Sequence, residues 1–333
     1  MSPPPTVSRY LVRALSEPEL ADDTYLISTG NELAWFANHV NNGNITACGT
    51  LTADIDLADY EWTPIGGTTL AKAFKGKFDG NGHTVSGLYI GNSTANYQGL
   101  FGYVSDSAIS NLTVDGHVEG KQYIGGIAAY LGTNAVIDRC VNNAEVVATG
   151  NYVGGIAGNS MATATITNSI NHADVKGNKY TAGILGYAQA KVMNCYSTGE
   201  ITGDGVGACL NGGTTTVKDG QTENVFCIRE YIFTTGQTLV SESEMASGEV
   251  AYVLGEAFGQ LIGVDPYPVI GGEKVYLLED GTYSNIPTEV NEIAAEREHL
   301  LIYGIDGSQR RQLCSGINII IYPDGTTRKV MIK

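Results

Sequence analysis

The chain has 333 residues, of which 35 are acidic and 19 are basic, giving a net charge of −16. This balance argues against nucleic acid or an anionic membrane surface as a partner, since both require clustered lysine and arginine. No run of about 18 apolar residues occurs, so we expect no insertion into a membrane.

The N-terminal part predicts a linker followed by a cap. Residues 1–22 contain three consecutive prolines and no apolar core, so we expect a leader or linker, with any export signal already removed. Residues 23–28 predict a short strand. Thr29 and Glu32 have the spacing of a capping box and open an amphipathic pattern that predicts a helix to about Val40. A helix at this point would cover the open end of a repeat array.

A pattern that recurs four times runs from about Tyr97 to Gly207, in steps of 26, 29 and 28 residues between equivalent tyrosines. Each repeat has two short runs with apolar residues at every second position, separated by Gly, Asn, Thr or Ser, and none has a long helical pattern. The period is also shorter than the roughly 40–45 residues of a propeller blade. Equivalent positions hold the following sets: Ile109, Ile137, Ile166 and Val192; Asn111, Arg139, Asn168 and Asn194; Val118, Val146, Val175 and Ile201.

These columns predict an all-β fold, a right-handed parallel β-helix with short capping helices and a small C-terminal β domain. Each repeat forms one coil, coils stack about 4.8 Å apart, and the aliphatic columns fill the bore. The Asn column is expected to form hydrogen bonds along the stack. We expect coils from about Thr46 to about Thr235 within a domain of residues 23–278.

The six cysteines do not have the spacing of a metal site. Cys140 and Cys195 fall in one inward column two coils apart, about 9 to 10 Å from each other. That separation is too large for a disulfide, so we expect small buried thiols.

The C-terminal part predicts three further segments. Residues 242–254 have a helical apolar pattern, weakened by Gly248, and residues 242–278 are expected to form the C-terminal cap. Residues 279–288 are rich in turn formers and predict a linker. Residues 289–333 contain strand-like runs and Asp324-Gly325, which favours a hairpin turn in a small β domain.

An acidic column is the first candidate site. Its members are Glu145, Asp174 and Glu200, with His117 at the equivalent position of the first repeat. Each is the neighbour of an inward residue of the Val column, so strand alternation is expected to point it outward. Stacked carboxylates repel unless a neighbour or cation relieves them, so a functional interpretation is a weak Ca²⁺ or ligand site. The sequence favours the other interpretation, a solvated acidic stripe that opposes aggregation.

A tyrosine column is the second candidate site. Tyr123, Tyr152 and Tyr180 recur with Tyr97 at equivalent positions. Exposed tyrosines would offer a platform on which sugar rings stack, whereas tyrosines tucked at a corner would be part of the core. The aliphatic residues and Gly that flank each tyrosine favour the core position.

No pattern nominates a catalytic nucleophile or base. The basic residues are scattered, the phosphate-loop, Gly-x-Ser-x-Gly and His-Glu-x-x-His motifs are absent, and Asp79-Gly-Asn-Gly-His83 favours a turn. We therefore expect no enzyme activity, no catalytic residues, no metal beyond weak Ca²⁺ and no cofactor.

The repeated phrases Tyr-x-Gly-Gly-Ile and Gly99-Leu-Phe-Gly102, with the run from Phe74 to Leu88, resemble the GLUG-motif repeats of bacterial surface and adhesin-like proteins. The tail, with Ile302-Tyr-Gly-Ile and Arg328-Lys-Val-Met-Ile-Lys333, resembles a type IX secretion sorting domain. The first resemblance implies a β-helix and adhesion. The second implies export to the outside, or to the outer-membrane surface, of a Gram-negative bacterium.

The sequence thus predicts a monomeric, non-enzymatic extracellular binding module whose side wall meets a host or microbial glycan or a surface protein. Two alternatives remain. A polysaccharide-active enzyme would require two carboxylates about 5 to 9 Å apart in a cleft. A structural spacer would have a wall with no aromatic or acidic concavity.

Overall fold

The computed structural model describes residues 14–58, 60–210, 221–231, 236–272, 275, 283, 301–304, 308–310, 316–321 and 327–332. Its contacts divide the chain into two units, Met1–Glu242 with Val253–Ala257 and Ser243–Tyr252 with Phe258–Lys333. Each unit is described by itself.

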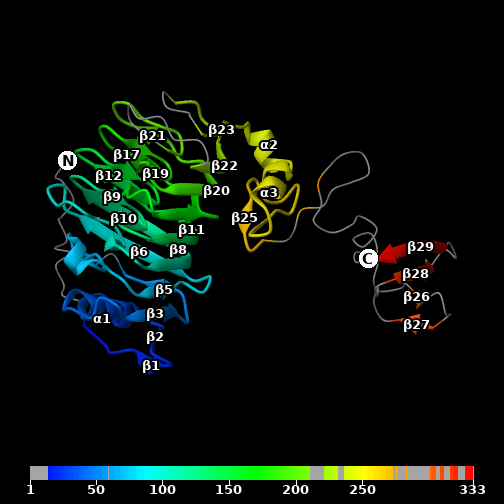
Figure 1. Ribbon diagram of the computed structural model, residues 1–333, viewed down its shortest axis with the longest axis horizontal. Coiled ribbons are helices and arrows are strands. Elements are labelled where there is room, and N and C mark those ends of the chain that lie inside the picture. The colour runs from blue at the N-terminus through cyan, green and yellow to red at the C-terminus, as the bar shows by residue number, and fades with distance from the viewer. Residues whose placement is uncertain are drawn as a thin grey trace, which may run out of the picture. The chain divides into compact units, whose positions relative to one another are not determined.

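The first unit is a parallel β-helix built from three sheets (Figure 1). One sheet has sixteen strands: β1 (Glu19–Ala21), β2 (Thr24–Ile27), β3 (Cys48–Leu51), β4 (Ile55–Asp56), β5 (Lys77–Asp79), β6 (Thr84–Gly91), β8 (Ala108–Gly120), β11 (Val136–Asn142), β12 (Glu145–Ala148), β15 (Thr165–Thr167), β16 (Ile170–Asn171), β17 (Val175–Lys176), β20 (Lys191–Ser197), β21 (Ile201–Thr202), β22 (Thr222–Cys227) and β23 (Thr238–Leu239). A second sheet has four strands: β7 (Phe101–Val104), β10 (Ala128–Leu131), β14 (Ala157–Ser160) and β19 (Leu185–Tyr187). The third has three: β9 (Ile124–Gly125), β13 (Val153–Gly154) and β18 (Thr181–Ala182).

The strand register confirms the predicted columns. Ile109 pairs with Ile137, Ile137 with Ile166, and Ile166 with Val192, all in parallel register. The second aliphatic column pairs in the same way, from Val118 to Ile201. Like residues therefore lie on like residues from coil to coil, which is the arrangement expected for a parallel β-helix.

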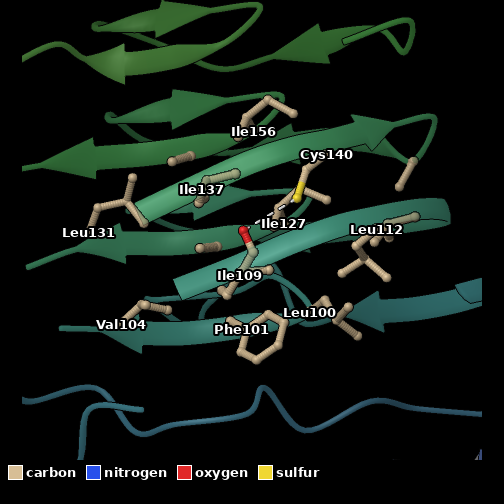
Figure 2. Packing of buried hydrophobic residues seen from close by; sticks show 14 of the residues in the cluster. Leu100, Phe101, Val104, Ile109, Leu112, Ile127, Leu131, Ile137, Cys140 and Ile156 are labelled. Carbon is tan, nitrogen blue, oxygen red and sulfur yellow. Dashed lines mark hydrogen bonds between the residues drawn. The ribbon is translucent and has the colours of Figure 1, made fainter. Parts of the chain in front are cut away.

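The bore is filled by these columns. The aliphatic residues of both columns are buried. Figure 2 shows Ile109 and Ile137 of the first column among other buried residues, such as Ile127. At the N-terminal end four phenylalanines continue the core, with ring centroids 5.2 to 6.3 Å apart: Phe36, Phe74, Phe78 and Phe101. Burial of apolar surface in this continuous core is the main stabilising contribution to the unit.

The first helix, α1 (Gly30–Asn41), forms the predicted N-terminal cap. Thr29 and Glu32 complete the capping box, since each side chain accepts a hydrogen bond from the other residue's backbone N–H. The helix buries Phe36 against β3, where a Cβ at Gly49 would lie 3.1 Å from the Phe36 ring. Glycine at this position therefore lets the helix approach the strand closely. A short 3₁₀ helix, Leu70–Lys72, is the other helical turn between the early strands.

Polar residues inside the array are paired along the stack. The amide of Asn194 donates to Asn168 at 3.3 Å and that of Asn224 donates to Asn194 at 2.9 Å, so the predicted Asn ladder is confirmed. Where Arg139 interrupts the column, Asn168 donates instead to Asp138 at 2.7 Å. Cys140 and Cys195 are buried free thiols, as predicted.

Three boundaries differ from the prediction. β1 lies within the segment expected to be a linker and pairs antiparallel with β2. β2 pairs in parallel with β3, so coil stacking begins before α1 rather than near Thr46, and it reaches β23. The single helix expected over 242–254 is wrong: α2 (Glu242–Ala246) and α3 (Glu249–Leu254) are separated at Gly248, whose φ of +94° a continuous helix does not contain.

The second unit contains two small sheets. β24 (Phe258–Gly259) and β25 (Val269–Ile270) pair antiparallel. The other sheet has the antiparallel order β27-β26-β28-β29, with β26 (Leu301–Gly304), β27 (Gln309–Arg310), β28 (Gly316–Ile321) and β29 (Thr327–Ile332). Antiparallel strands are thus present in the region predicted to form a small β domain, and the bounds of that domain stay a prediction. The Asp324-Gly325 turn and Cys314 lie outside the described residues, and the capping role of residues 242–278 and the linker of residues 279–288 stay predictions.

Candidate binding wall of stacked tyrosines

The tyrosine column lies on the outer surface of the β-helix, immediately before the strands of the three-stranded sheet. Its members are partly exposed rather than core residues. A second set of tyrosines lies beside it on β7, β10 and β19, where Tyr103 pairs with Tyr130 in register and Asn159 interrupts the column before Tyr187. Ring contacts join both sets into one surface, here called the tyrosine wall: Tyr97, Tyr103, Tyr123, Tyr130, Tyr152, Tyr180 and Tyr187.

The first set forms a ladder of parallel rings. The centroid distances are 4.7 Å for Tyr97–Tyr123, 4.9 Å for Tyr123–Tyr152 and 5.0 Å for Tyr152–Tyr180. The interplanar angles are 15°, 2° and 7° in the same order. The spacing equals the distance between coils, so each ring covers a face of the ring in the next coil.

The backbone at every ladder position is left-handed. The φ values are +60° at Tyr97, +60° at Tyr123, +67° at Tyr152 and +57° at Tyr180. A bulky L-residue rarely adopts this conformation, which costs roughly 1–2 kcal/mol per residue. In the next coil the equivalent position is Gly205, with φ of +70°, because Thr181 pairs with Val206. The turn therefore favours glycine, and tyrosine at four successive positions is retained against a backbone cost.

Partial burial disfavours ionisation of five of the phenolic groups in the wall. Burial, followed by the neighbouring tyrosines, raises the pKa of Tyr97, Tyr123 and Tyr152 above the ordinary value. The pKa of Tyr103 and Tyr130 is raised by burial first as well. At neutral pH these five tyrosines present uncharged hydroxyls that both donate and accept hydrogen bonds.

A surface groove of about 450 Å³ adjoins the N-terminal end of the ladder. Tyr97 and Gln98 line it from one coil, and residues 61–64 and 66–68 line it from the coil before. Trp62 is buried there, and its indole N–H donates to the carbonyl of Leu100 at 3.1 Å. Among the charged residues, Glu61 and Lys72 line the groove.

The acidic column is outward and in register, with His117 opposite Glu145. The exposed carboxylate of Glu145 lies 2.9 Å from Nδ1 of His117, and Asp174 accepts the backbone N–H of Glu200 at 2.8 Å. Within the described ranges, no group of three or more His, Cys, Asp or Glu side chains is placed to hold a metal ion. The structure therefore brings these residues side by side but directs two of them to protein partners, and their binding role stays a prediction.

A second groove, of about 460 Å³, is lined by Cys48, Lys75 and Asp106 among others. Lys75 and Asp106 form an ion pair across 3.4 Å. Each groove contains a single carboxylate, Glu61 in one and Asp106 in the other. Neither has the pair of carboxylates that the polysaccharide-active alternative requires.

Sequence reasoning found the tyrosine column but favoured a core position for it, and it missed two further features. The tyrosines on β7, β10 and β19 do not recur in every repeat, so no periodic signal marked them as part of one surface. The groove depends on residues 61–68, which precede the regular repeats. The only signal for it was Trp62 in the irregular coil.

Comparison with known proteins gives limited information about identity. No protein-family model matches the chain. A protein of Evansella cellulosilytica, provisionally described as a Gly-rich membrane protein, is 34% identical over 128 residues, which is 35% of this chain and 14% of that protein. The chain therefore spans a small part of that relative's length. Among the described residues, none of the helices is long and apolar enough to cross a membrane.

The fold has a counterpart among solved structures. A crystal structure of a Bacteroides ovatus protein, provisionally assigned as an immunoglobulin A1 protease, is similar with a TM-score of 0.51 and 18% sequence identity. The similarity covers 77% of this chain and 95% of that chain. At this identity the likeness establishes a shared fold and nothing about activity.

Proposed function

We propose that this chain is a non-enzymatic binding module displayed at a bacterial surface, and that its tyrosine wall binds a glycan or a surface protein. The observation that carries the proposal is the contiguous wall of seven partly exposed tyrosines on the β-helix. Tyrosine supplies a large contact area with few rotatable bonds and a hydroxyl for hydrogen bonding, and it is enriched at binding surfaces for this reason.

The ladder's backbone cost supports the same proposal. Tyrosine is kept at a left-handed position where glycine would be free of strain, and strained conformations cluster at functional sites. The surface location follows from the resemblance to GLUG-motif repeats and to type IX sorting domains. It agrees with the Gly-rich membrane protein to which part of the chain is similar. A pure spacer has no need of an aromatic wall beside a groove.

The test is a glycan-array and surface-protein screen of the full chain, with and without Ca²⁺. One arm replaces Glu145 and Asp174 by Ala, and the matched arm replaces Tyr103 and Tyr130 by Ala. The proposal expects binding that survives chelation and the acidic substitutions but weakens in the tyrosine variant. Binding lost on chelation and in the acidic variant would transfer the site to the acidic column. No binding to any probe would leave the spacer alternative.

A further inference from the structure

We propose that a neutral pyranose ring of a glycan binds against the open face of Tyr97, in the groove between the ladder and the coil of residues 61–68. This inference rests on the proposed binding function and specifies its ligand class. It differs from a platform spread along the wall, because it assigns recognition to one end of the ladder.

The inner rings of the ladder cannot stack on a sugar. Tyr123 is covered by Tyr97 at 4.7 Å on one face and by Tyr152 at 4.9 Å on the other. Tyr152 is covered in the same way by Tyr123 and Tyr180. A pyranose binds an aromatic ring by placing its partly positive C–H groups on the negative π face, and these faces are already occupied. Tyr123 and Tyr152 present only their edges and hydroxyls.

Tyr97 is the ring whose second face meets a groove. Tyr123 stacks on one side of it, and its nearest other ring contacts in the described part of the chain, Tyr130 and Tyr103, lie farther away at 6.2 and 6.4 Å. On the side of the preceding coil Tyr97 lines the groove. Tyr180 ends the ladder at the other end, but it lines neither of the two grooves described above.

The groove has the size and polarity of a sugar site. Its volume of about 450 Å³ lies within the roughly 300–1,000 Å³ of small-molecule sites. Glu61 and Asn92 bring a carboxylate and an amide, and Lys72 brings an ammonium group. One oxygen of Glu61 accepts the backbone N–H of Gly91 at 3.2 Å, which fixes the carboxylate in place. Such groups suit the hydroxyls around a sugar ring.

Charge selects a neutral sugar. Glu61 and Lys72 balance one another in the groove, and the chain as a whole carries −16, so a uronic acid or sulfated sugar would meet a repulsive field. Part of the groove is formed before any ligand binds, because buried Trp62 is held by its hydrogen bond to the carbonyl of Leu100 at 3.1 Å. Preorganised contacts lower the entropy cost of binding.

The experiment is calorimetric titration of the full chain with tetrasaccharides of β-glucan, α-mannan and β-galactan, and with tetragalacturonate as the acidic probe. Each is repeated with Tyr97→Ala, Tyr97→Phe, Glu61→Gln, Tyr152→Ala and Tyr231→Ala. Tyr231→Ala is the matched control, since Tyr231 is a partly exposed tyrosine outside the wall. Tyr152→Ala removes a ladder ring at a similar positive φ and separates the Tyr97 site from the rest of the wall. Thermal unfolding of each variant verifies that it folds.

We expect at least one neutral probe to bind, with about tenfold weaker affinity for Tyr97→Ala, at most about threefold weaker affinity for Tyr97→Phe and Tyr152→Ala, and unchanged affinity for Tyr231→Ala. Glu61→Gln is expected to weaken binding severalfold. Tetragalacturonate is expected to bind more weakly than the neutral probes. Binding to the wild type that Tyr97→Ala leaves intact, or that Tyr152→Ala reduces equally, overturns the Tyr97 site but not the wall. Failure of every probe on the wild type overturns this inference together with the glycan form of the proposed function.

Discussion

At the scale of single residues, the ladder sets a backbone cost against a side-chain gain. Each tyrosine occupies a left-handed turn, and each ring stacks on its neighbours at 4.7 to 5.0 Å. Stacked aromatic pairs contribute about 0.5–1.5 kcal/mol beyond the area they bury. An inner ring has two such contacts, so stacking offsets the roughly 1–2 kcal/mol of backbone strain.

This balance predicts an unusual order of stability at Tyr152. Tyr152→Ala loses the ring and keeps a strained L-residue at φ of +67°, whereas Tyr152→Gly loses the ring and the strain together. We expect the glycine variant to be more stable than the alanine variant by about 1 kcal/mol. Urea unfolding measures the difference.

Tyr130 provides the matched control, because it lies in β10 and is not among the left-handed residues. There the ordinary order should hold, with glycine less stable than alanine by about 0.5–1 kcal/mol. The same order at both positions would contradict the account of the ladder.

Buried polar residues between the coils give a second residue-scale prediction. The amide of Asn171 donates to the carbonyl of Ala173 at 2.8 Å and to Ser197 at 3.2 Å, and its oxygen accepts from Asn142 at 2.8 Å. Asn171→Ala removes all three hydrogen bonds, two of them to the buried residues Asn142 and Ser197, and should lower the unfolding free energy by about 3 kcal/mol. Asn178→Ala, at an exposed position, should change it by less than about 0.5 kcal/mol. Equal effects of the two substitutions on thermal unfolding would argue against a stabilising role for the hydrogen bonds of Asn171.

The residue scale also marks the limit of sequence reasoning. The sequence predicted columns correctly, because β-helix stacking places repeated residues in register. It could not predict that the tyrosines stack face to face, since a half-exposed corner and an exposed platform give the same periodicity. Ring orientation depends on the left-handed φ, and only the equivalent Gly205 in the next coil hints at it.

At the scale of elements, the start of α1 depends on local capping interactions that the sequence pattern predicts. The carboxylate of Glu32 accepts hydrogen bonds from the N–H and hydroxyl of Ser28 at 2.7 and 2.8 Å and from the N–H of Thr29 at 2.9 Å. Partial burial of Glu32 alone would raise its pKa, but these hydrogen bonds outweigh it and lower the pKa below 4.5. The ionised form therefore stabilises the cap.

The sign of the resulting pH dependence follows from the depressed pKa. The stabilisation by Glu32 is present above its unfolded pKa, near 4.5, and is lost as the pH falls through the lower folded value. We expect Glu32→Gln to be less stable than the wild type at pH 7, with the difference shrinking below about pH 4. Thermal unfolding across this range tests it, with exposed Glu17→Gln as the control. A difference that is constant with pH would contradict this role for the carboxylate.

Elements with weaker local signals were predicted less well. β1 has only three residues, and its pairing with β2 is a tertiary contact that composition does not reveal. The interruption at Gly248 was visible as a poor helix former, but the apolar spacing on both sides suggested continuity. Local chemistry thus predicted the capped helix, while contacts between elements decided the other boundaries.

At the scale of the whole molecule, the β-helix is an array whose coils contact their neighbours, so opening should begin at its ends. The reactivity of the cysteine thiols measures where this opening begins. Burial raises the pKa of Cys140 to about 12 and that of Cys227 to about 11, so neither reacts while folded. Cys48 is partly exposed.

We therefore expect iodoacetamide to modify Cys48 first, then Cys227 near the C-terminal end of the described coils, and Cys140 in the interior last. Peptide mass spectrometry resolves the sites. Identical rates at Cys140 and Cys227 over a range of urea concentrations would show one cooperative unit and contradict opening from the ends.

The most direct measurement of the central claim is a nitration footprint of the full chain. Tetranitromethane would be applied with and without a saturating concentration of the best-binding neutral tetrasaccharide, and each tyrosine read by mass spectrometry. We predict that the ligand protects Tyr97 and leaves Tyr152, whose faces are covered in either state, unchanged. Protection of Tyr187 without protection of Tyr97 would contradict a sugar site at the open end of the tyrosine wall.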